Sequence, residues 1–351
     1  MGKLAVYKYV SFMFLVASAI LTVFTIAGLF GGQVTPAGNN ALAMLVYALP
    51  FLLLGNVFIL IYWLIRRRWR WAIMPTFTLL CCIPYIGTFY QPPFLSHTDK
   101  TMSGMVVATY NVAAFDKETS GFKSGDILGE MKKHNVDVFC IQEYKDQSGD
   151  RLNSETYKDW FPYHAFGRED MIIFSRYPIV KSEAIGFGNT NNSAMWADIN
   201  VAGSVVRVFN AHLETTGFNR TLRKVAKMEL EGLTIKENAV IKALYGNYTM
   251  GMIVRARQSR MVADEIAKSD VPVILCGDFN DVPYSYTYHT MRGNLVDGFK
   301  ECGSGFMSTY RGKKKFRIDY IFHDKQLKGL EYFKQELTYS DHDPVFMKIA
   351  L

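Results

Sequence analysis

Three long runs of apolar residues dominate the first ninety positions of the chain. They cover residues 9–31, 42–65 and 72–90, contain no charged side chain, and approach the ~20 residues that a helix needs to cross a bilayer. The pattern predicts three transmembrane helices, with Pro50, Pro75 and Pro84 as tolerated kinks. The first run is also compatible with a cleaved signal peptide, but it is longer than the usual apolar core of one and two more runs follow.

The basic residues around these runs predict an orientation. Lys3 and Lys8 flank the first run, and the segment RRRWR at 66–70 separates the second run from the third. By the positive-inside rule both segments are cytoplasmic, so a third crossing would carry everything after about residue 95 out of the cytoplasm. Uncleaved spans without paired cysteines fit an integral protein of a bacterial inner membrane, with its C-terminal part in the periplasm.

After about residue 95 the pattern changes to that of a folded domain. Residues 1–95 are expected to form the membrane anchor, 96–103 a linker and 104–351 one domain of the α/β class. Short apolar runs rich in β-branched residues predict strands, and a helical pattern covers 122–135. The strand candidates are 105–110, 136–142, 171–175, 204–211, 271–277, 317–322 and 344–349.

A helical insertion of unusual length is predicted at about 214–256. Its first part is basic, with Arg220, Arg223, Lys224 and Lys227 in one short segment. Two interpretations stay open for it. It is either a solvated helix packed on the domain, or a basic amphipathic helix that rests on the membrane or gates a cleft.

Composition and charge narrow the class of protein. With 49% hydrophobic and 20% charged residues, the chain is neither disordered nor purely membrane-embedded. Only six of its 39 basic residues and none of its 32 acidic ones precede residue 99, so the rest is nearly neutral. The basic net charge of +7 is therefore weak support for nucleic-acid binding. Five cysteines without a CxxC spacing exclude a disulfide scaffold and the usual zinc sites.

Polar residues stand at the ends of the predicted strands. The segments are Tyr110-Asn111, Gln142-Glu143, Asn210-Ala211-His212, Gly277-Asp278-Phe279-Asn280 and Ser340-Asp341-His342, with Asp319 inside a further strand. Together they supply carboxylates, carboxamides and two imidazoles but no thiolate, which suits Mg²⁺ or Mn²⁺. The same groups suit phosphoester hydrolysis, which needs a cation, a positioned water and assistance to the leaving oxygen.

The set and order of these segments resemble the endonuclease/exonuclease/phosphatase superfamily. QE, NAH, GDFN, RIDYIF and SDHDPV follow one another from about residue 104 to 351. The resemblance implies a four-layer α/β sandwich of two central β-sheets flanked by helices, as in DNase I. It also implies a divalent-metal-dependent hydrolase in which water attacks phosphorus in line, without a covalent enzyme intermediate.

The resemblance also implies a role for each residue. Glu143 would be the principal metal ligand, with Asn111 beside it and Asp341 lining the site. Asp278 would orient or deprotonate the attacking water, and Asn280 would hold that water or a phosphate oxygen. His342 would contact the scissile phosphate, with Asp319 bonded to its other ring nitrogen, which fixes the tautomer. His212 would bind phosphate or assist the leaving group.

Other positions bear on the substrate. Ala113 stands where the related abasic-site endonucleases carry Asp, which argues against a repair role. Lys313, Lys314 and Lys315 could clamp an anionic substrate or form a solvated hairpin tip. Arg168 is a further candidate for substrate binding, and His164 and Asp170 could also approach the cleft.

The substrate class stays open. A nuclease-like phosphodiesterase, a phospholipid or sphingolipid phosphodiesterase and a phosphomonoesterase all fit, as does a non-catalytic binding module of another class. The expected partners are a phosphoester substrate, either nucleic acid or a lipid headgroup, and the lipid bilayer. No obligate protein partner is inferred.

Overall fold

The computed structural model describes the chain in two compact units. The described residues are 3–95, 102–113, 124–144, 157–168, 170–188, 190–217, 237–312 and 315–351, with some positions between 221 and 231. One unit contains Met1–Gly87 and Pro283–His289, and the other contains Thr88–Val282 and Thr290–Leu351. Helix α9 (Tyr286–Arg292) begins in the first unit and ends in the second.

The first unit is built from apolar helices. They are α1 (Lys3–Gly31), α2 (Asn40–Ile65), α3 (Trp69–Cys81) and the short α4 (Ile83–Ile86). Two of them, over Ala5–Gly31 and Asn40–Ile65, are long and apolar enough to cross a membrane. By length and composition alone, the first could equally be a signal sequence.

The expectation of a third membrane-spanning helix over 72–90 is wrong. The helix α3 has 13 residues and ends at Cys81, and a separate turn of helix follows from Ile83. At about 1.5 Å per residue, α3 is far shorter than the ~30 Å hydrocarbon core. Pro84 lies at the start of α4, where its missing N–H is tolerated, and the residue before a proline disfavours helical backbone.

Polar side chains join the apolar helices from within the bundle. Trp63 Nε1 of α2 donates to Ser18 Oγ of α1 at 3.0 Å, and Asn56 Nδ2 donates to Thr25 Oγ1 at 2.9 Å. The hydroxyls of Thr22 and Thr78 lie 2.9 Å apart, which links α1 to α3. Large apolar side chains face outward on the same helices; they include Phe12, Val23, Phe51, Phe58, Ile73 and Phe77. The unit thus has an apolar exterior, and its interior combines apolar packing around Ile59 and Trp63 with these polar contacts.

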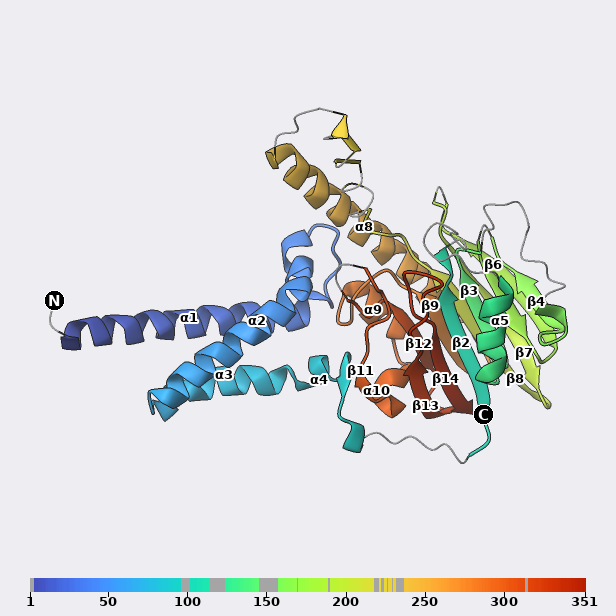
Figure 1. Ribbon diagram of the computed structural model, residues 1–351, viewed down its shortest axis with the longest axis horizontal. Coiled ribbons are helices and arrows are strands. Elements are labelled where there is room, and N and C mark those ends of the chain that lie inside the picture. The colour runs from blue at the N-terminus through green and yellow to red at the C-terminus, as the bar shows by residue number, and fades with distance from the viewer. Residues whose placement is uncertain are drawn as a thin grey trace. The chain divides into compact units, whose positions relative to one another are not determined.

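The second unit contains two six-stranded mixed sheets that face each other (Figure 1). One has the order β13-β14-β2-β3-β5-β4 and the other β10-β12-β9-β8-β7-β6. The first comprises Lys328–Lys334, Val345–Ala350, Met105–Asn111, Val138–Gln142, Ile172–Ser175 and Tyr163–Phe166. The second comprises Val296–Asp297, Asp319–His323, Val273–Asp278, Ser204–His212, Ser193–Val201 and Ile179–Gly186. Strands β2 and β3 are parallel, as are β8 and β9, and the other neighbours are antiparallel.

Helices flank these sheets, and the alternation of side chains along the strands divides the core. On β2, Val107 belongs to the cluster between the sheets, whereas the next residue, Ala108, faces the side of α5 (Ser124–Lys133). The long helix α8 (Glu237–Ile266) and the short α10 (Gly298–Cys302) belong to the same unit. A two-stranded ribbon joins β1 (Tyr90–Gln91) to β11 (Gly305–Phe306), and a short 3-10 helix covers Pro93–Leu95. The predicted sandwich of two sheets flanked by helices is confirmed.

A buried ion pair fixes the start of the RIDYIF strand. The guanidinium of Arg317 donates to both carboxylate oxygens of Asp297 at 2.6 and 2.8 Å, and both side chains are almost fully buried. Removing one partner leaves the other charge buried and unpaired in the core. Asp297→Ala should therefore destabilise this unit by about 3–5 kcal/mol in urea unfolding followed by near-UV circular dichroism. Glu336→Ala removes an exposed partner of Lys334 and should leave the urea concentration at the midpoint of unfolding unchanged. Equal midpoints for the two variants would contradict this account.

Candidate active site

Strand register brings the polar strand ends together at one edge of each sheet. In the second sheet, parallel pairing sets His212 opposite Asp278, and antiparallel pairing sets Asp319 opposite Asp278 on its other side. In the first sheet, β2 and β3 are parallel, so Asn111 lies beside Gln142 and Glu143 follows directly. Residues that are more than a hundred positions apart in sequence thus share one edge.

Hydrogen bonds connect the two sheets at this edge. Asn111 Nδ2 lies 3.0 Å from Glu143 Oε1 in its own sheet and 3.0 Å from Asp278 Oδ2 in the other. Deeper in the core, Gln142 Nε2 donates to Asn210 Oδ1 at 2.6 Å. These side chains, apart from the half-exposed Glu143, are buried, so the network fixes the spacing between the sheets as well as the positions of the acids.

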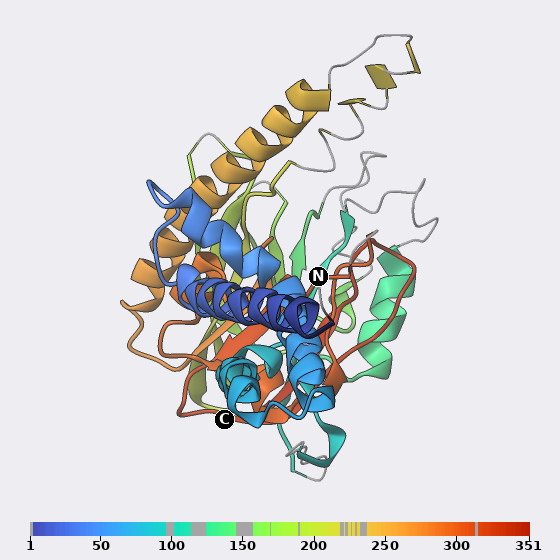
Figure 2. The ribbon, with the colours of Figure 1, turned by 90° about the vertical axis from the view of Figure 1, so that its left-hand side faces the viewer.

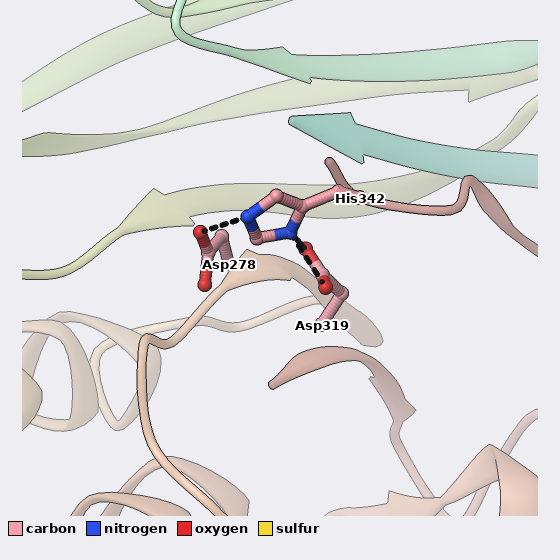
Figure 3. A group of neighbouring side chains, drawn as sticks. All are labelled: Asp278, Asp319 and His342. Carbon is pink, nitrogen blue, oxygen red and sulfur yellow. Dashed lines mark hydrogen bonds and ion pairs between the residues drawn. The ribbon is translucent and has the colours of Figure 1, made fainter. Parts of the chain in front are cut away.

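The imidazole of His342 lies between two carboxylates (Figure 3). Its Nδ1 is 3.0 and 3.2 Å from the two oxygens of Asp319, and its Nε2 is 3.7 Å from Asp278 Oδ2. With Asp319 accepting from Nδ1, the other ring nitrogen is directed toward Asp278. The ring of Tyr310, at 5.2 Å between centroids, packs edge-on against the imidazole. Sequence patterns gave no indication of this contact with Tyr310.

These carboxylates set the protonation of the imidazole. Burial disfavours a charged His342, but the charges of Asp319 and Asp278 outweigh it and raise its pKa to about 10. Burial, together with the charge of Asp319, raises the pKa of Asp278 to about 6, although both imidazoles oppose the shift. At neutral pH the site thus holds a protonated imidazole next to a carboxylate that can take up a proton near neutrality.

The second imidazole, His212, has a similar environment. Its Nδ1 is 3.4 Å from Asp170 Oδ2 and its Nε2 is 3.7 Å from Glu143 Oε1. Burial opposes the charged ring, but the contact with Asp170 and the charges of Asp278, Asp170 and Glu143 raise its pKa to about 9. Asp170 precedes a strand, which the sequence does indicate, but only the fold sets it against His212.

Left-handed backbone conformations orient the side chains of two predicted site residues. Glu143 and Asn280 have φ angles of 54° and 51°, in the left-handed region that residues other than glycine seldom adopt. Such backbone needs outside support, and it tends to occur at functional sites. The support for Asn280 comes from its backbone N–H, which donates to Asp278 Oδ1 at 2.7 Å, and from its Nδ2, which donates to Leu213 O at 2.9 Å.

The donor set fits a hard divalent cation. The side chain of Glu143 is 39% exposed and leaves carboxylate oxygen accessible beside the carboxamide of Asn111. Asp341 is exposed next to this edge; its carboxylate lies 3.5 Å from Ser340 Oγ, and no contact joins it to Glu143 among the described residues. Asp278, Asp319 and His342 form a second acidic and imidazole group whose ligand atoms lie within 4.8 Å of one another. There, Nδ1 of His342 is already hydrogen-bonded to Asp319.

The predicted substrate-binding residues are less closely associated with the site. Lys313 and Lys314 lie outside the described residues, and Lys315 is exposed. The guanidinium of Arg168 lies over Gly186 on β6, and His164 packs against Phe166 and Phe174. Among the described residues, no contact joins Arg168 or His164 to Asp278, Asp319 or His342.

Comparisons with known proteins assign the chain to a family. Residues 108–342 match the model of the endonuclease/exonuclease/phosphatase family, and residues 11–89 match a domain of unknown function, DUF8431. A 3′-5′ exoribonuclease subunit, Ccr4 of the CCR4-Not complex from Phaeosphaeria nodorum, is 25% identical over 277 residues. That match covers 64% of this chain but only 45% of the relative's own length.

Solved structures share the fold at low identity. A humanized TDP2 from D. rerio has a TM-score of 0.54 at 17% identity, and the match covers 71% of this chain and all of that one. A mannosyl-6-phosphatase from Bacteroides thetaiotaomicron has a TM-score of 0.50 at 17% identity, with the same coverage. Because the family model spans about two thirds of the chain, from 108 to 342, this protein belongs to the endonuclease/exonuclease/phosphatase family.

Proposed function

We propose that the protein is a membrane-anchored, divalent-metal-dependent phosphodiesterase of nuclease type. The observation that carries the hydrolytic mechanism is the line Asp319–His342–Asp278, with Asp278 bonded through Asn111 to Glu143. It joins a proton acceptor, a protonated imidazole and an oxygen-rich cation site within one hydrogen-bonded group.

Each side chain then has a distinct task. Asp278 holds the attacking water and accepts its proton, while the amide of Asn280 holds the water or a phosphate oxygen. The imidazolium of His342 contacts the phosphate and stabilises the negative charge that develops on it, and Asp319 keeps the ring oriented. His212, held by Asp170, binds phosphate or gives a proton to the leaving oxygen. A cation held by Glu143 and Asn111, with Asp341 nearby, would supply further charge neutralisation.

The class of substrate is the second part of the proposal. The relatives named above act on RNA or on a phosphosugar, and one D. rerio TDP2 structure holds a single-stranded DNA product. Two of these three are nucleic-acid proteins, which favours a polynucleotide. The near-neutral charge of residues 99–351 argues against tight duplex binding, so a single strand or a short end is the preferred form. A lipid headgroup is the second candidate, because a bilayer tether would keep headgroups close.

A paired assay tests the function. Purified full-length protein with Mg²⁺ is given single-stranded DNA and RNA, mixed phospholipid–sphingolipid vesicles, and a sugar phosphate in parallel, with Asp278→Asn as the blank. Shortened polynucleotide, absent with the variant, would support the nuclease. Released phosphorylated headgroup or free phosphate would instead assign one of the other two substrate classes. Metal binding without turnover on any substrate would mean a binding module.

Removal of the metal should abolish activity. EDTA should reduce turnover to the blank, and Mg²⁺ or Mn²⁺ should restore it in the wild type. Glu143→Gln should need a much higher metal concentration, because it removes the charged ligand but keeps the shape. Glu183→Gln, a surface carboxylate change on β6, is the control and should leave the metal dependence unchanged. Full activity in EDTA would refute metal dependence.

The membrane anchor is supported by the apolar exterior of the first unit. Helices with apolar exteriors that are joined by Ser, Thr, Asn and Trp hydrogen bonds are typical of bundles in lipid. In water, the same outward Phe, Ile and Val side chains would promote aggregation. We therefore treat α1 and α2 as membrane spans.

The side of the membrane depends on what the chain does between Trp69 and Gly87. Two crossings alone return it to the side of the Arg66–Arg68 cluster. We propose an extracytoplasmic domain, as in a bacterial periplasm, because Thr78 of α3 bonds to Thr22 in the middle of α1 and α3 has an apolar exterior.

Reporter fusions test this orientation. Alkaline phosphatase fused after Leu351 in a bacterial host should be active, because it matures only outside the cytoplasm. Green fluorescent protein fused at the same point should not fluoresce, because it matures only inside the cytoplasm. The opposite pair of results would place the domain in the cytoplasm. Fusions after Arg68 serve as the matched control and should show the cytoplasmic pattern.

A further inference from the structure

The N-terminal half of α8 extends away from the sheets of its own unit (Figures 1 and 2). None of the side chains from 238 to 250 is buried, whereas buried positions begin at Gly251 and recur as far as Val262. We call residues 238–250 the α8 arm. An isolated helix of this length is marginal in water, since packing supplies most helical stability.

The composition of the α8 arm does not suit water. From 238 to 254 the sequence is NAVIKALYGNYTMGMIV, in which Lys242 is the one charged residue. Ile241, Leu244, Tyr245 and Tyr248 recur at helical spacing and form one stripe along the arm. The side chains of Ile241 and Tyr245 are 63% and 53% exposed. A solvated helix would carry several charges on its outer face, so this stripe is built to be covered.

The other end of α8 is fixed close to the active site. Gln258 Oε1 accepts from the backbone N–H of Glu214 at 2.8 Å, and Arg255 donates to Glu214 O at 3.1 Å. Arg255 also donates to Asp281 at 3.2 Å. Glu214 is two residues after His212, and Asp281 directly follows Asn280. Whatever covers the arm therefore acts on a helix whose base holds the two loops that carry site residues.

We propose that the α8 arm docks on the surface of a phospholipid bilayer that contains anionic headgroups. The proposal rests on the membrane anchor described under Proposed function, because that anchor keeps a bilayer within reach of the domain. The exposed Tyr245 has the apolar body and polar tip that favour the membrane interface. Lys242 flanks the stripe and Lys224 precedes it; both are exposed and would face anionic headgroups.

A second copy of the chain is the weaker occupant. Pairing two α8 arms across a two-fold axis would cover the stripe but would give Lys242 no acidic partner on the arm. The bilayer instead offers apolar interior for the stripe and negative charge for Lys242.

Site-directed spin labels on the full-length protein test the docking. Cys81 and Cys82 are first replaced by Ala, and the other three cysteines are buried and unreactive. Single cysteines then replace Tyr245 on the arm, Ile20 on α1, and Val180, an exposed apolar residue on β6. Each labelled protein is placed, one copy per disc, in nanodiscs of phosphatidylcholine with phosphatidylglycerol. Collision rates with oxygen and with a soluble nickel complex report whether each label contacts lipid or water.

For each label we take the collision rate with oxygen divided by the collision rate with the nickel complex. We expect this ratio to be several-fold higher at Ile20 and Tyr245 than at Val180. Discs of phosphatidylcholine alone should lower the ratio at Tyr245 and leave that at Ile20 unchanged. A label at Tyr245 that matches Val180, while Ile20 contacts lipid, would overturn the docking but leave the anchor intact. A water-exposed Ile20 would overturn the anchor itself. Spin–spin coupling at Tyr245 that needs two copies per disc would assign the arm to a dimer and overturn the proposal.

Discussion

Replacing His342 with alanine is expected to lower kcat by about 10³-fold on whichever phosphoester the protein cleaves. The substitution removes the imidazolium that Asp319 and Asp278 hold at the edge of the sheets, and the imidazole of His212 is instead held between Asp170 and Glu143. KM should change little if the ring acts mainly in the transition state. Steady-state kinetics with saturating Mg²⁺ measure both quantities.

A control at the far end of β12, the strand that begins with Asp319, separates an effect on catalysis from an effect on folding. His323 is buried and lies 2.7 Å from a carboxylate oxygen of Glu301, but it is remote from the site edge. His323→Ala should lower the thermal midpoint and preserve kcat per folded molecule. If both histidine variants lost turnover equally, the role assigned to His342 would be wrong.

Asp319 gives a further check on the same ring. Asp319→Asn removes the charge that raises the pKa of His342, so that pKa should fall. If the protonated ring is the active form, the alkaline limb of the pH–rate profile should then move to lower pH. A positioning residue of this kind typically contributes about 10–100-fold. A uniform loss of activity without a shifted profile would indicate a merely structural role for Asp319.

Replacing Asp278 with asparagine should be at least as damaging, with a loss of about 10³-fold or more in kcat. The carboxamide keeps the size of the side chain and can still accept from the N–H of Asn280. It cannot take a proton from water, and it removes one of the two charges that raise the pKa of His342. The variant should fold, because burial penalises the charge that it deletes.

The matched control is Asp198→Asn, which weakens the ion pair with Arg207 on β7 and β8 away from the site. Its turnover should equal that of the wild type, whereas its thermal midpoint should fall. Activity of Asp278→Asn within tenfold of the wild type, at saturating metal, would mean that another group activates the water.

The elements that the sequence predicted well are those with a local signature. Runs such as 204–211 and 271–277 are short, apolar and β-branched, and the structure has β8 at Ser204–His212 and β9 at Val273–Asp278. Edge strands such as β6, whose side chains are mostly exposed or half-buried, give no such pattern and were not predicted. The prediction of a third membrane-spanning helix was wrong for a related reason. Average apolarity does not reveal that the helix stops at Cys81, where Ile83-Pro84 restarts it.

The chain by itself determined the types of its central elements and the chemical inventory at the strand ends, because both depend on neighbouring residues. It also determined the family, since the spacing of GDFN and SDHDPV is linear information. The family resemblance already implied that Asp319 pairs with His342. Only the tertiary structure decided that Asp170 contacts His212 and that Asn111 links Glu143 to Asp278. Those pairings depend on the register between strands and on the spacing of two sheets, which residues far apart in the sequence fix together.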